Sequence, residues 1–450
     1  MSRRHRGCTA RLAGAVLVVA LWLGVLATPA AAVQIQPVRA GDIEAWLIED
    51  HANPILSLRI AFRDSGSAFD PADKAGLARL TAALLDEGAG NLDSQAFQAK
   101  LEDLAIRLSF SADRDNFFGS LTTLTANRDT AFELLRLALM QPRFDDEPVA
   151  RNRSQLEAYL RRSAEDPESR SDDVLWEKLF ADSPYAHPVE GTLESLPRID
   201  RTDLQRFLRE RLARNGLVLG VVGDITGAEL APLLEKTFGG LPVQAAPVAI
   251  PEMQPKGAGI VSVVNMDVPQ SAISFAQPGL KRDDPRFYTL TVLNQILGGS
   301  GLSSRLFDEI RERRGLVYGV STAPVPLDHA ALIMGNAATG NEHAAETLSL
   351  IRQEWHRFST GGVTAAELSD SKTFLTGSFP LRFTGSARLA GMLASVQLEN
   401  LGIDYLNRRN GLIEAVGLED INTLARSLLN AEALTFVVVG RPQGVLPSQK

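Results

Sequence analysis

The sequence predicts two α+β domains of related structure. A chain of 450 residues is too long for one hydrophobic core and suits two domains. Strand-like and helix-like patterns are mixed along both halves, which is typical of α+β architecture. The halves also end alike: a helical segment precedes Leu-Val-Leu-Gly-Val-Val-Gly at 217–223, and another precedes Leu-Thr-Phe-Val-Val-Val-Gly at 434–440. This similarity indicates a duplicated domain.

Residues 1–32 have the pattern of a secretory signal peptide. Four arginines precede an apolar run at 12–27, and Ala-Ala-Ala at 30–32 gives a cleavage site before Val33. The run is too short for a comfortable membrane span, and no later segment is long and uncharged enough to cross a bilayer. We therefore expect an exported chain without a membrane span after cleavage, located in a bacterial periplasm.

Charge and cysteine content exclude several classes of function. Without residues 1–32, which carry four arginines and no acids, 42 basic and 54 acidic residues remain, a net charge of −12. Nucleic-acid binding requires basic patches, so we expect no nucleic-acid partner. The only cysteine, Cys8, would be lost with the signal peptide. The mature chain would thus have neither a disulfide nor thiol chemistry.

The first domain is predicted over 33–245. Alternating or continuous apolar runs predict strands, and apolar residues at helical spacing predict helices. The expected strands are 43–48, 55–62, 106–112, 116–124 and 217–222, and the expected helices are 76–87, 94–104, 129–140, 147–164, 203–212 and 227–238.

A proline- and glycine-rich stretch at 246–258 is predicted to link the domains. The second domain is expected over 259–450, with the same types of pattern. Its strands are predicted at 260–264, 271–276, 330–337 and 434–439, and its helices at 286–297, 341–358, 364–376, 387–401 and 418–428.

A glycine-rich stretch at 298–320 is the most informative part of the second domain. Gly-Gly-Ser-Gly at 298–301 is followed by Leu-Ser-Ser-Arg-Leu-Phe and an apolar face at helical spacing. Gly315 follows a basic last turn, which is the usual signal for a helix end. Tyr318 then lies in a strand-like run, seven residues after Arg311. From the residues alone, a capped amphipathic helix with surface arginines is the simpler interpretation.

This stretch resembles the C-terminal half-signature of the pitrilysin/insulinase family, the inverted-motif zinc peptidases. In that family an Arg/Tyr pair faces the zinc across a closed chamber and helps to hold the substrate peptide. The resemblance implies that Arg311 and Tyr318 are this pair, and that Gly298, Gly299, Ser300, Gly301 and Ser303 line the chamber beside the substrate. It covers essentially the whole mature chain. It implies two homologous domains, each a layered, antiparallel-rich sheet packed with helices, that form a clamshell.

The zinc motif of the family is absent from the matching helix. Family members carry H-x-x-E-H after a Gly-Leu-Ala run, and a later glutamate completes the site. Here the frame Gly-Leu-Ala at 76–78 is kept, but Arg79, Ala82 and Ala83 replace the first histidine, the glutamate and the second histidine. The later position falls on Glu157 or Tyr159. One carboxylate cannot hold zinc, and a fixed guanidinium repels a dication. We therefore expect no metal or other cofactor in this chain.

Other catalytic sites find no support in the sequence. No two of the mature histidines share a predicted helix at a metal-ligand spacing. The chain has no Gly-x-Ser-x-Gly elbow for acyl chemistry, and Gly298–Gly301 lacks the lysine of a phosphate-binding loop.

Three functions remain open, in order of preference. The resemblance favours the zinc-less subunit of a heterodimeric zinc peptidase, inactive alone, whose zinc-bearing homologous partner would supply the metal site. In that role Arg311 and Tyr318 would contact the peptide substrate and its transition state. The second function is a scaffold with a peptidase-like fold, like the zinc-less core subunits of a respiratory complex in this family. The third is an active peptidase with an unusual site, for which the sequence offers no ligands.

Overall fold

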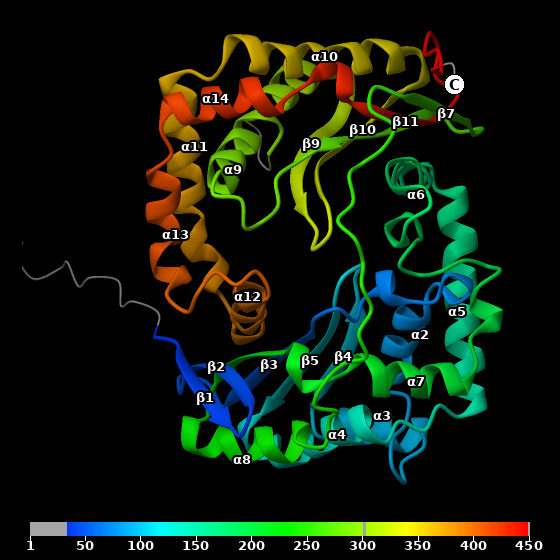
Figure 1. The fold of residues 1–450 in the computed structure, drawn as a ribbon, viewed down its shortest axis with the longest axis vertical. Coiled ribbons are helices and arrows are strands. Elements are labelled where there is room, and N and C mark those ends of the chain that lie inside the picture. The colour runs from blue at the N-terminus through cyan, green and yellow to red at the C-terminus, as the bar shows by residue number, and fades with distance from the viewer. Residues whose placement is uncertain (1–33, 300–302, 449–450) are drawn as a thin grey trace, which may run out of the picture. The chain divides into compact units, whose positions relative to one another are not determined.

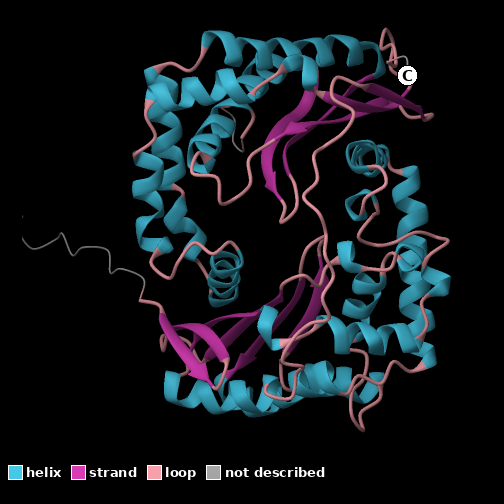
Figure 2. Ribbon diagram, viewed as in Figure 1, coloured by secondary structure: helices cyan, strands magenta, loops and turns pink. Residues whose placement is uncertain are grey.

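The structure, a computed structural model, describes residues 34–299 and 303–448. The predicted signal peptide, Ser300 and Gly301 lie outside these ranges. Residues from Ile35 onward form one compact unit. Two separate sheets, each accompanied by helices, make up this unit (Figure 2). None of the described helices is both long and apolar enough to cross a membrane.

The first sheet has six strands in the order β1-β2-β6-β3-β5-β4. β2 and β6 are parallel, and the other neighbours are antiparallel. The strands are β1 (Gln36–Ala40), β2 (Ile43–Glu49), β3 (Ile55–Phe62), β4 (Arg107–Ala112), β5 (Phe117–Leu124) and β6 (Leu217–Gly223). The helices of this half are α2 (Leu77–Leu84), α3 (Ser94–Asp103), α4 (Arg128–Met140), α5 (Asp146–Glu165), α6 (Pro167–Phe180), α7 (Arg201–Arg211) and α8 (Gly227–Phe238).

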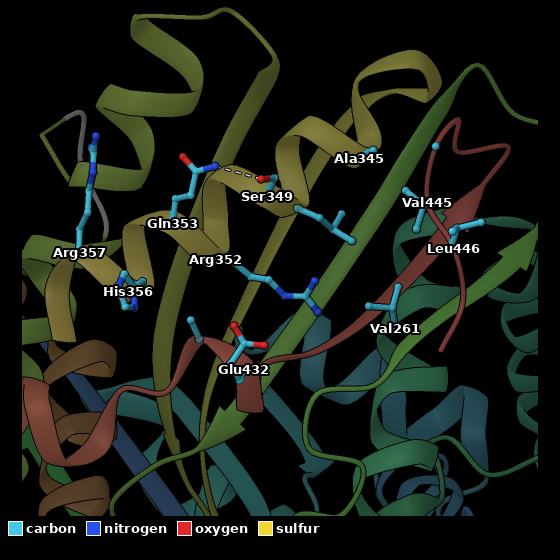
Figure 3. Close-up of a pocket in the computed structure, with 13 residues that line it drawn as sticks. Val261, Ala345, Ser349, Arg352, Gln353, His356, Arg357, Glu432, Val445 and Leu446 are labelled. Carbon is cyan, nitrogen blue, oxygen red and sulfur yellow. Dashed lines mark hydrogen bonds between the residues drawn. The ribbon is translucent and has the colours of Figure 1, made fainter. Parts of the chain in front are cut away.

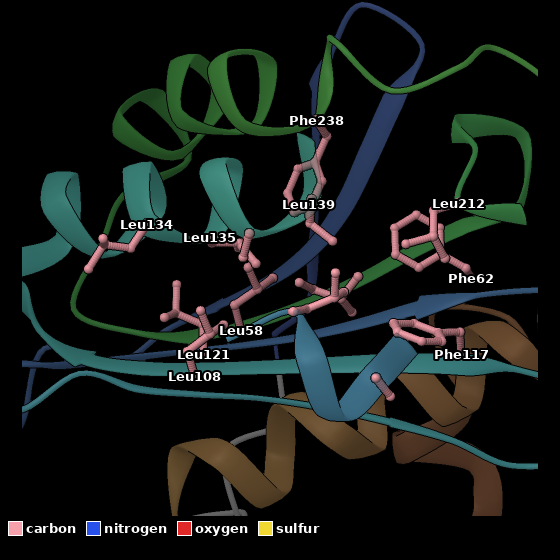
Figure 4. Close-up of a cluster of buried hydrophobic side chains, with 14 of the residues drawn as sticks. Leu58, Phe62, Leu108, Phe117, Leu121, Leu134, Leu135, Leu139, Leu212 and Phe238 are labelled. Carbon is pink, nitrogen blue, oxygen red and sulfur yellow. The ribbon is translucent and has the colours of Figure 1, made fainter. Parts of the chain in front are cut away.

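One face of this sheet packs against helices to form the first core. Along β5, buried and half-buried residues alternate, because successive side chains of a strand point to opposite faces. Leu121 and Leu58 of the sheet lie under Leu135 of α4, and Phe238 of α8 joins the same cluster (Figure 4).

The second sheet has five strands in the order β7-β11-β8-β10-β9. Its strands are β7 (Val261–Asn265), β8 (Gln270–Pro278), β9 (Val317–Pro326), β10 (Ala331–Gly340) and β11 (Thr435–Gly440). The helices of this half are α9 (Phe287–Leu297), α10 (Ala344–Gly361), α11 (Ala365–Gly377), α12 (Ser386–Leu398), α13 (Tyr405–Glu414) and α14 (Leu418–Leu428). A second cluster of buried residues, centred on Phe275, Trp355 and Phe436, forms its core.

The strand orders confirm the predicted duplication. Without β1, the first sheet reads β2-β6-β3-β5-β4, which matches β7-β11-β8-β10-β9 position by position. In both sheets the first two of these strands are parallel and the rest are antiparallel. β6 and β11, the two similar sequences, occupy the same place. Each ends in a glycine with positive φ, 141° at Gly223 and 150° at Gly440, a conformation that other residues rarely adopt.

Each sheet is also covered by a helix from the other half of the chain. α6 packs on β8 and β11, and α12 packs on β3 and β6 (Figure 1). A Cβ at Gly220 of β6 would lie 2.4 Å from the backbone oxygen of Ala390, so the glycine permits the close approach of α12. Ser171 of α6 and Ser274 of β8 form a buried hydrogen bond of 2.7 Å.

The structure differs from the sequence expectations at several elements. β1, α6 and α13 were not predicted, and no helix or strand lies between Phe238 and Val261, where the linker was placed. The domain boundaries 33–245, 246–258 and 259–450 remain a prediction. The expected α-helix after Ser303 is a π-helical segment at Phe307–Glu312.

Candidate functional site

The helix that carries the zinc motif in the resembled family is α2. Its N-terminus is fixed by Asp70, whose carboxylate accepts hydrogen bonds from the backbone N–H groups of Gly76 and Ala78, both at 3.0 Å. Gly76 has φ 92°, and a Cβ there would lie 2.7 Å from the backbone oxygen of Glu190. The absence of a side chain at Gly76 thus lets the loop carrying Glu190 pack against the start of α2.

A cavity of about 390 Å³ lies where the metal would be expected. It is lined by Arg79 and Ala83 of α2, by Asn152, Gln155, Leu156 and Tyr159 of α5, and by Glu190. Ala82 is buried in the first core, 1% exposed, and does not line the cavity. Glu157 is also absent from the lining and forms an ion pair with Arg161 at 3.1 Å. Of the two residues considered for the third ligand, Tyr159 lines the cavity and Glu157 does not.

Zinc in proteins requires three or four ligands from cysteine, histidine or carboxylate side chains. The cavity presents a guanidinium, a phenol, two amides and one carboxylate. Nowhere in residues 34–299 and 303–448 do three histidine, cysteine or acidic side chains gather closely enough to hold an ion. The donor set does not fit zinc, so this chain has no metal site at the family position.

The two helices of this wall are braced by a polar network. The carboxylate of Glu87 accepts hydrogen bonds from Asn152 at 3.1 Å, from Ser94 at 2.5 Å and from Arg151 at 2.6 Å. Burial opposes ionisation of Glu87, but these hydrogen bonds outweigh it and lower its pKa. Asn152 is thus committed to joining α5 to the end of α2.

Arg311 and Tyr318 come together on the other half of the chain. The Cζ of Arg311 lies 4.6 Å from the ring centre of Phe307 and 5.5 Å from that of Tyr318. These are cation–π distances. Tyr318 lies near the start of β9, the edge strand of the second sheet, and is 86% exposed. The structure therefore places the predicted pair side by side.

The neighbouring arginines have a different role. Glu309 is buried, and its carboxylate pairs with Arg313 at 3.3 Å and with Arg314 at 2.5 Å. Among the described residues, the one ion pair of Arg311 is with Glu312, at 3.7 Å. The simple interpretation, a helix end with equivalent surface arginines, accounts for Arg313 and Arg314 but not for Arg311.

Arg311 is presented by an unusual turn. The N–H of Arg313 bonds to the carbonyl of Asp308 at 2.9 Å, a π-type hydrogen bond, and Gly315 ends the turn with φ 65°. π-helical turns are rare and occur frequently at functional sites.

Tyr318 lines a second cavity, also of about 390 Å³. Gly299 and Phe307 line it as well, together with residues of β8, β9 and β10. Three residues of α6, Glu168, Ser171 and Asp172, also line it. The cavity thus combines an exposed phenol, an edge strand and two carboxylates one helical turn apart.

The other predicted substrate-binding residues lie elsewhere. Gly298 does not line the cavity: a Cβ there would lie 2.5 Å from the Oγ1 of Thr322, and its carbonyl accepts a 2.7 Å hydrogen bond from the Thr322 N–H. Its role is to let α9 pack against β9. Ser303 is exposed and also lies outside the lining, while Ser300 and Gly301 fall outside the described residues.

The two carboxylates of α6 that line this cavity, Glu168 and Asp172, form an acidic wall that was not predicted from the sequence. Asp166 accepts a hydrogen bond from the Ser169 N–H at 2.8 Å, and Pro167 follows at the first helical position. Asp-Pro is a helix-start signal, and it could have identified α6. Asp172 is held in place by the hydroxyl of Ser274, which donates to its carboxylate at 2.5 Å.

Comparisons with known proteins agree with this geometry. Residues 47–193 match the model for the insulinase family, peptidase family M16, and residues 198–375 match the model described as the peptidase M16 inactive domain. A non-peptidase homolog, YmxG, from Helicobacter pylori is 27% identical over 94% of this chain and 97% of its own length. An uncharacterized zinc protease of Mycobacterium bovis is 30% identical over 59% of this chain and 61% of its own length.

A solved structure supports the same assignment. The peptidase M16 inactive domain from Pseudomonas fluorescens is 28% identical and superposes with a TM-score of 0.86, over 92% of this chain and 100% of that one. With two duplicated domains of the M16 type and no ligand set at the metal position, the chain belongs to the insulinase family as a non-catalytic, peptidase-like member.

Proposed function

We propose that this chain is the zinc-less subunit of a periplasmic peptidase and pairs with a zinc-bearing homologous subunit. Arg311 and Tyr318 would contact the peptide that the partner cleaves. The observation that carries the proposal is the contrast between the two sites. The metal position has lost its ligands, whereas Tyr318 remains 86% exposed at the rim of a cavity. A chain kept only as a scaffold has no need of an exposed aromatic ring held by a guanidinium.

The proposed chemistry follows from what the two side chains can donate. The hydroxyl of Tyr318 can give a hydrogen bond to the carbonyl under attack or to the adjoining peptide backbone, where negative charge develops. The guanidinium of Arg311 can bind a peptide carbonyl or a carboxylate, because it presents several N–H donors in one plane. The metal and the attacking water would belong to the partner subunit.

Co-expression tests this function. The chain is purified alone and together with a zinc-bearing homologue from the same genome, and peptide cleavage and zinc content are measured. We expect cleavage from the pair and none from the chain alone. Chelator-sensitive cleavage by the isolated chain, equal to that of the pair, would contradict the proposal.

Substitutions in the pair separate direct contact from packing. Arg311→Ala should lower turnover without removing zinc from the partner. Arg313→Ala is the matched control, because that arginine lies on the same turn but pairs with Asp308 and Glu309. If Arg311→Ala and Arg313→Ala have the same turnover, Arg311 has no direct contact with the substrate and its packing on Phe307 and Tyr318 is purely structural.

Export is part of the proposal and has its own test. Mass spectrometry of the chain recovered from the periplasmic fraction should give a mature N-terminus at Val33. Full-length chain in the cytoplasm would contradict this location while leaving the pairing with a zinc subunit open.

A scaffold is the second candidate, and the name of one relative favours it. The Helicobacter pylori protein, which matches this chain over almost its whole length, is named a non-peptidase homolog. A scaffold would bind its partner but would leave peptide cleavage unchanged when Arg311 or Tyr318 is replaced.

A further inference from the structure

A cavity of about 650 Å³ lies on the second half of the chain, on the polar side of α10. Its walls are α10, the first residue of β7, the turn before β11 and the C-terminal segment 444–446 (Figure 3). It shares no lining residue with the cavity at Tyr318 or with the one at Arg79. Its volume is within the range of small-ligand sites.

Arg352 points from α10 into this cavity (Figure 3). Its Nε is buried and has no hydrogen-bond acceptor within residues 34–299 and 303–448. Its Cζ lies 5.0 Å from the ring centre of Phe436, so the aromatic face offers one favourable contact. No carboxylate of the described chain lies within ion-pair distance of the guanidinium. The half-buried guanidinium therefore has no carboxylate partner among the described residues, and its terminal N–H groups could form charge-assisted hydrogen bonds with a ligand carboxylate.

Arg357, about one turn further along α10, also lines this cavity, but its guanidinium already has a carboxylate partner. It pairs with the buried carboxylate of Glu354 at 2.7 Å. Figure 3 shows its side chain pointing away from Arg352. The missing partner is therefore particular to Arg352 and is not a general property of this helix.

The lining is mixed: α10 contributes polar side chains, and apolar residues come from α10, β7 and the C-terminal segment. Val261 and Leu348 are buried beside the cavity, and Val445 and Leu446 border it from the C-terminal segment. Leu446 is 84% exposed, so burial of its side chain against an apolar ligand would be favourable. Glu432 is the one carboxylate in the lining, and its charge disfavours ligands with several negative charges.

We propose that this cavity binds an apolar chain that ends in a single carboxylate. The terminal N–H groups of Arg352 bind the carboxylate, and Leu348, Val261 and Leu446 contact the apolar stem. A fatty acid and the free C-terminus of an apolar peptide share this chemistry. The proposal does not depend on the pairing with a zinc subunit.

Titration calorimetry with decanoate and decanol on the purified chain tests the carboxylate contact. Charge-assisted hydrogen bonds are strong enough that decanoate should bind at least about tenfold more tightly than decanol. Arg352→Gln should abolish this difference, and Arg357→Gln, the matched control, should keep it. Equal binding of acid and alcohol, no binding of either, or the same loss in both variants would overturn the proposal.

A second variant covers the case in which Arg352→Gln fails to fold, as judged by circular dichroism. Glu432→Gln removes the one negative charge of the lining and should tighten decanoate binding several-fold without affecting decanol. Unchanged decanoate binding in that variant would count against a carboxylate in this cavity. Acetyl-Leu-Val-Leu with a free or an amidated C-terminus then distinguishes the two sources of the carboxylate. If the free peptide binds more tightly than decanoate and amidation abolishes its binding, the ligand is a peptide terminus. If the free peptide binds more weakly than decanoate, the ligand is a fatty acid.

Discussion

Removal of a single hydroxyl group at Tyr318 should separate function from stability. In the free chain Tyr318 is 86% exposed, and its described contact is the cation–π stack with Arg311 at 5.5 Å. Tyr318→Phe keeps the ring and the stack, so the free energy of unfolding should change by less than about 0.5 kcal/mol, as for other surface substitutions. In the reconstituted pair, the lost hydrogen bond acts on the transition state. Loss of one such donor costs about 10²–10³ in kcat, or roughly 3–4 kcal/mol.

Tyr185 provides the matched control, since the same substitution there removes the same group from the protein interior. Tyr185 is fully buried, its hydroxyl donates to Asp115, and it accepts a 3.2 Å hydrogen bond from the His329 N–H. Tyr185→Phe leaves these buried groups unpaired, which should cost about 1–3 kcal/mol of stability. Turnover of the folded fraction should be unchanged.

Urea unfolding of the free chain and steady-state cleavage by the pair measure the two effects. The expected pattern is crossed: Tyr318→Phe lowers turnover and spares stability, and Tyr185→Phe does the reverse. If both variants leave turnover intact, Tyr318 has no role in the transition state. If Tyr318→Phe destabilises the chain as much as Tyr185→Phe does, the hydroxyl of Tyr318 is buried in solution, and its exposed position at the cavity rim is contradicted.

Three further predictions follow from other contacts. Burial raises the pKa of Asp86 to about 6, so the native state binds more protons than the unfolded state between about pH 4 and 6, and stability falls as pH rises through this window. Asp86→Asn should therefore raise the free energy of unfolding by up to about 3 kcal/mol at pH 7.5 and leave it unchanged at pH 3. Urea titration measures both values, and equal gains at the two pH values would contradict the assignment. Ser274→Ala removes the buried link between α6 and β8 and should cost about 1–3 kcal/mol, whereas Ser321→Ala on exposed β9 should cost almost nothing; equal costs would mean that α6 is held by apolar packing alone. In the pair, a peptide with a lysine facing Glu168 and Asp172 should have a higher kcat/KM than the matching norleucine peptide. Glu168→Gln should lower this ratio of kcat/KM values about fivefold, the effect of one partly exposed ion pair. An unchanged ratio would mean that the two carboxylates do not select the substrate.

The duplication could be predicted from the sequence because its signal is local and strong. Two buried strands with nearly the same pattern, each ending in glycine, occupy equivalent places in the two sheets. The Arg311–Tyr318 contact was also predictable through the family resemblance, since a fixed spacing across a turn brings the two side chains together. The strand-and-helix pattern alone could not distinguish Arg311 from Arg313, because both occupy a basic helix end.

Long-range packing could not be inferred from the sequence. The identity of the residue that faces Arg79, Glu157 or Tyr159, depends on the rotation of α5 relative to α2, and a shift of two positions changes the helix face. α6 was not predicted from the sequence. Its apolar residues Val174 and Leu175 pack on the sheet of the other half of the chain, a contact that the local sequence does not reveal. Its polar residues 168–173 obscured the helical period, although Asp-Pro marked its start. The π-helical form of the turn at Phe307–Glu312 was not predicted either; in this turn Glu309 is buried and pairs with Arg313 and Arg314.

The central claim is that the former metal position of this chain cannot hold a dication. Inductively coupled plasma mass spectrometry of the mature chain, dialysed against zinc and then against metal-free buffer, tests it directly. We predict no stoichiometric zinc, because Arg79, Ala82, Ala83 and Tyr159 offer no ligand set. One zinc ion per chain that survives dialysis and is lost on Glu190→Gln, which removes the only carboxylate of that cavity, would contradict the account.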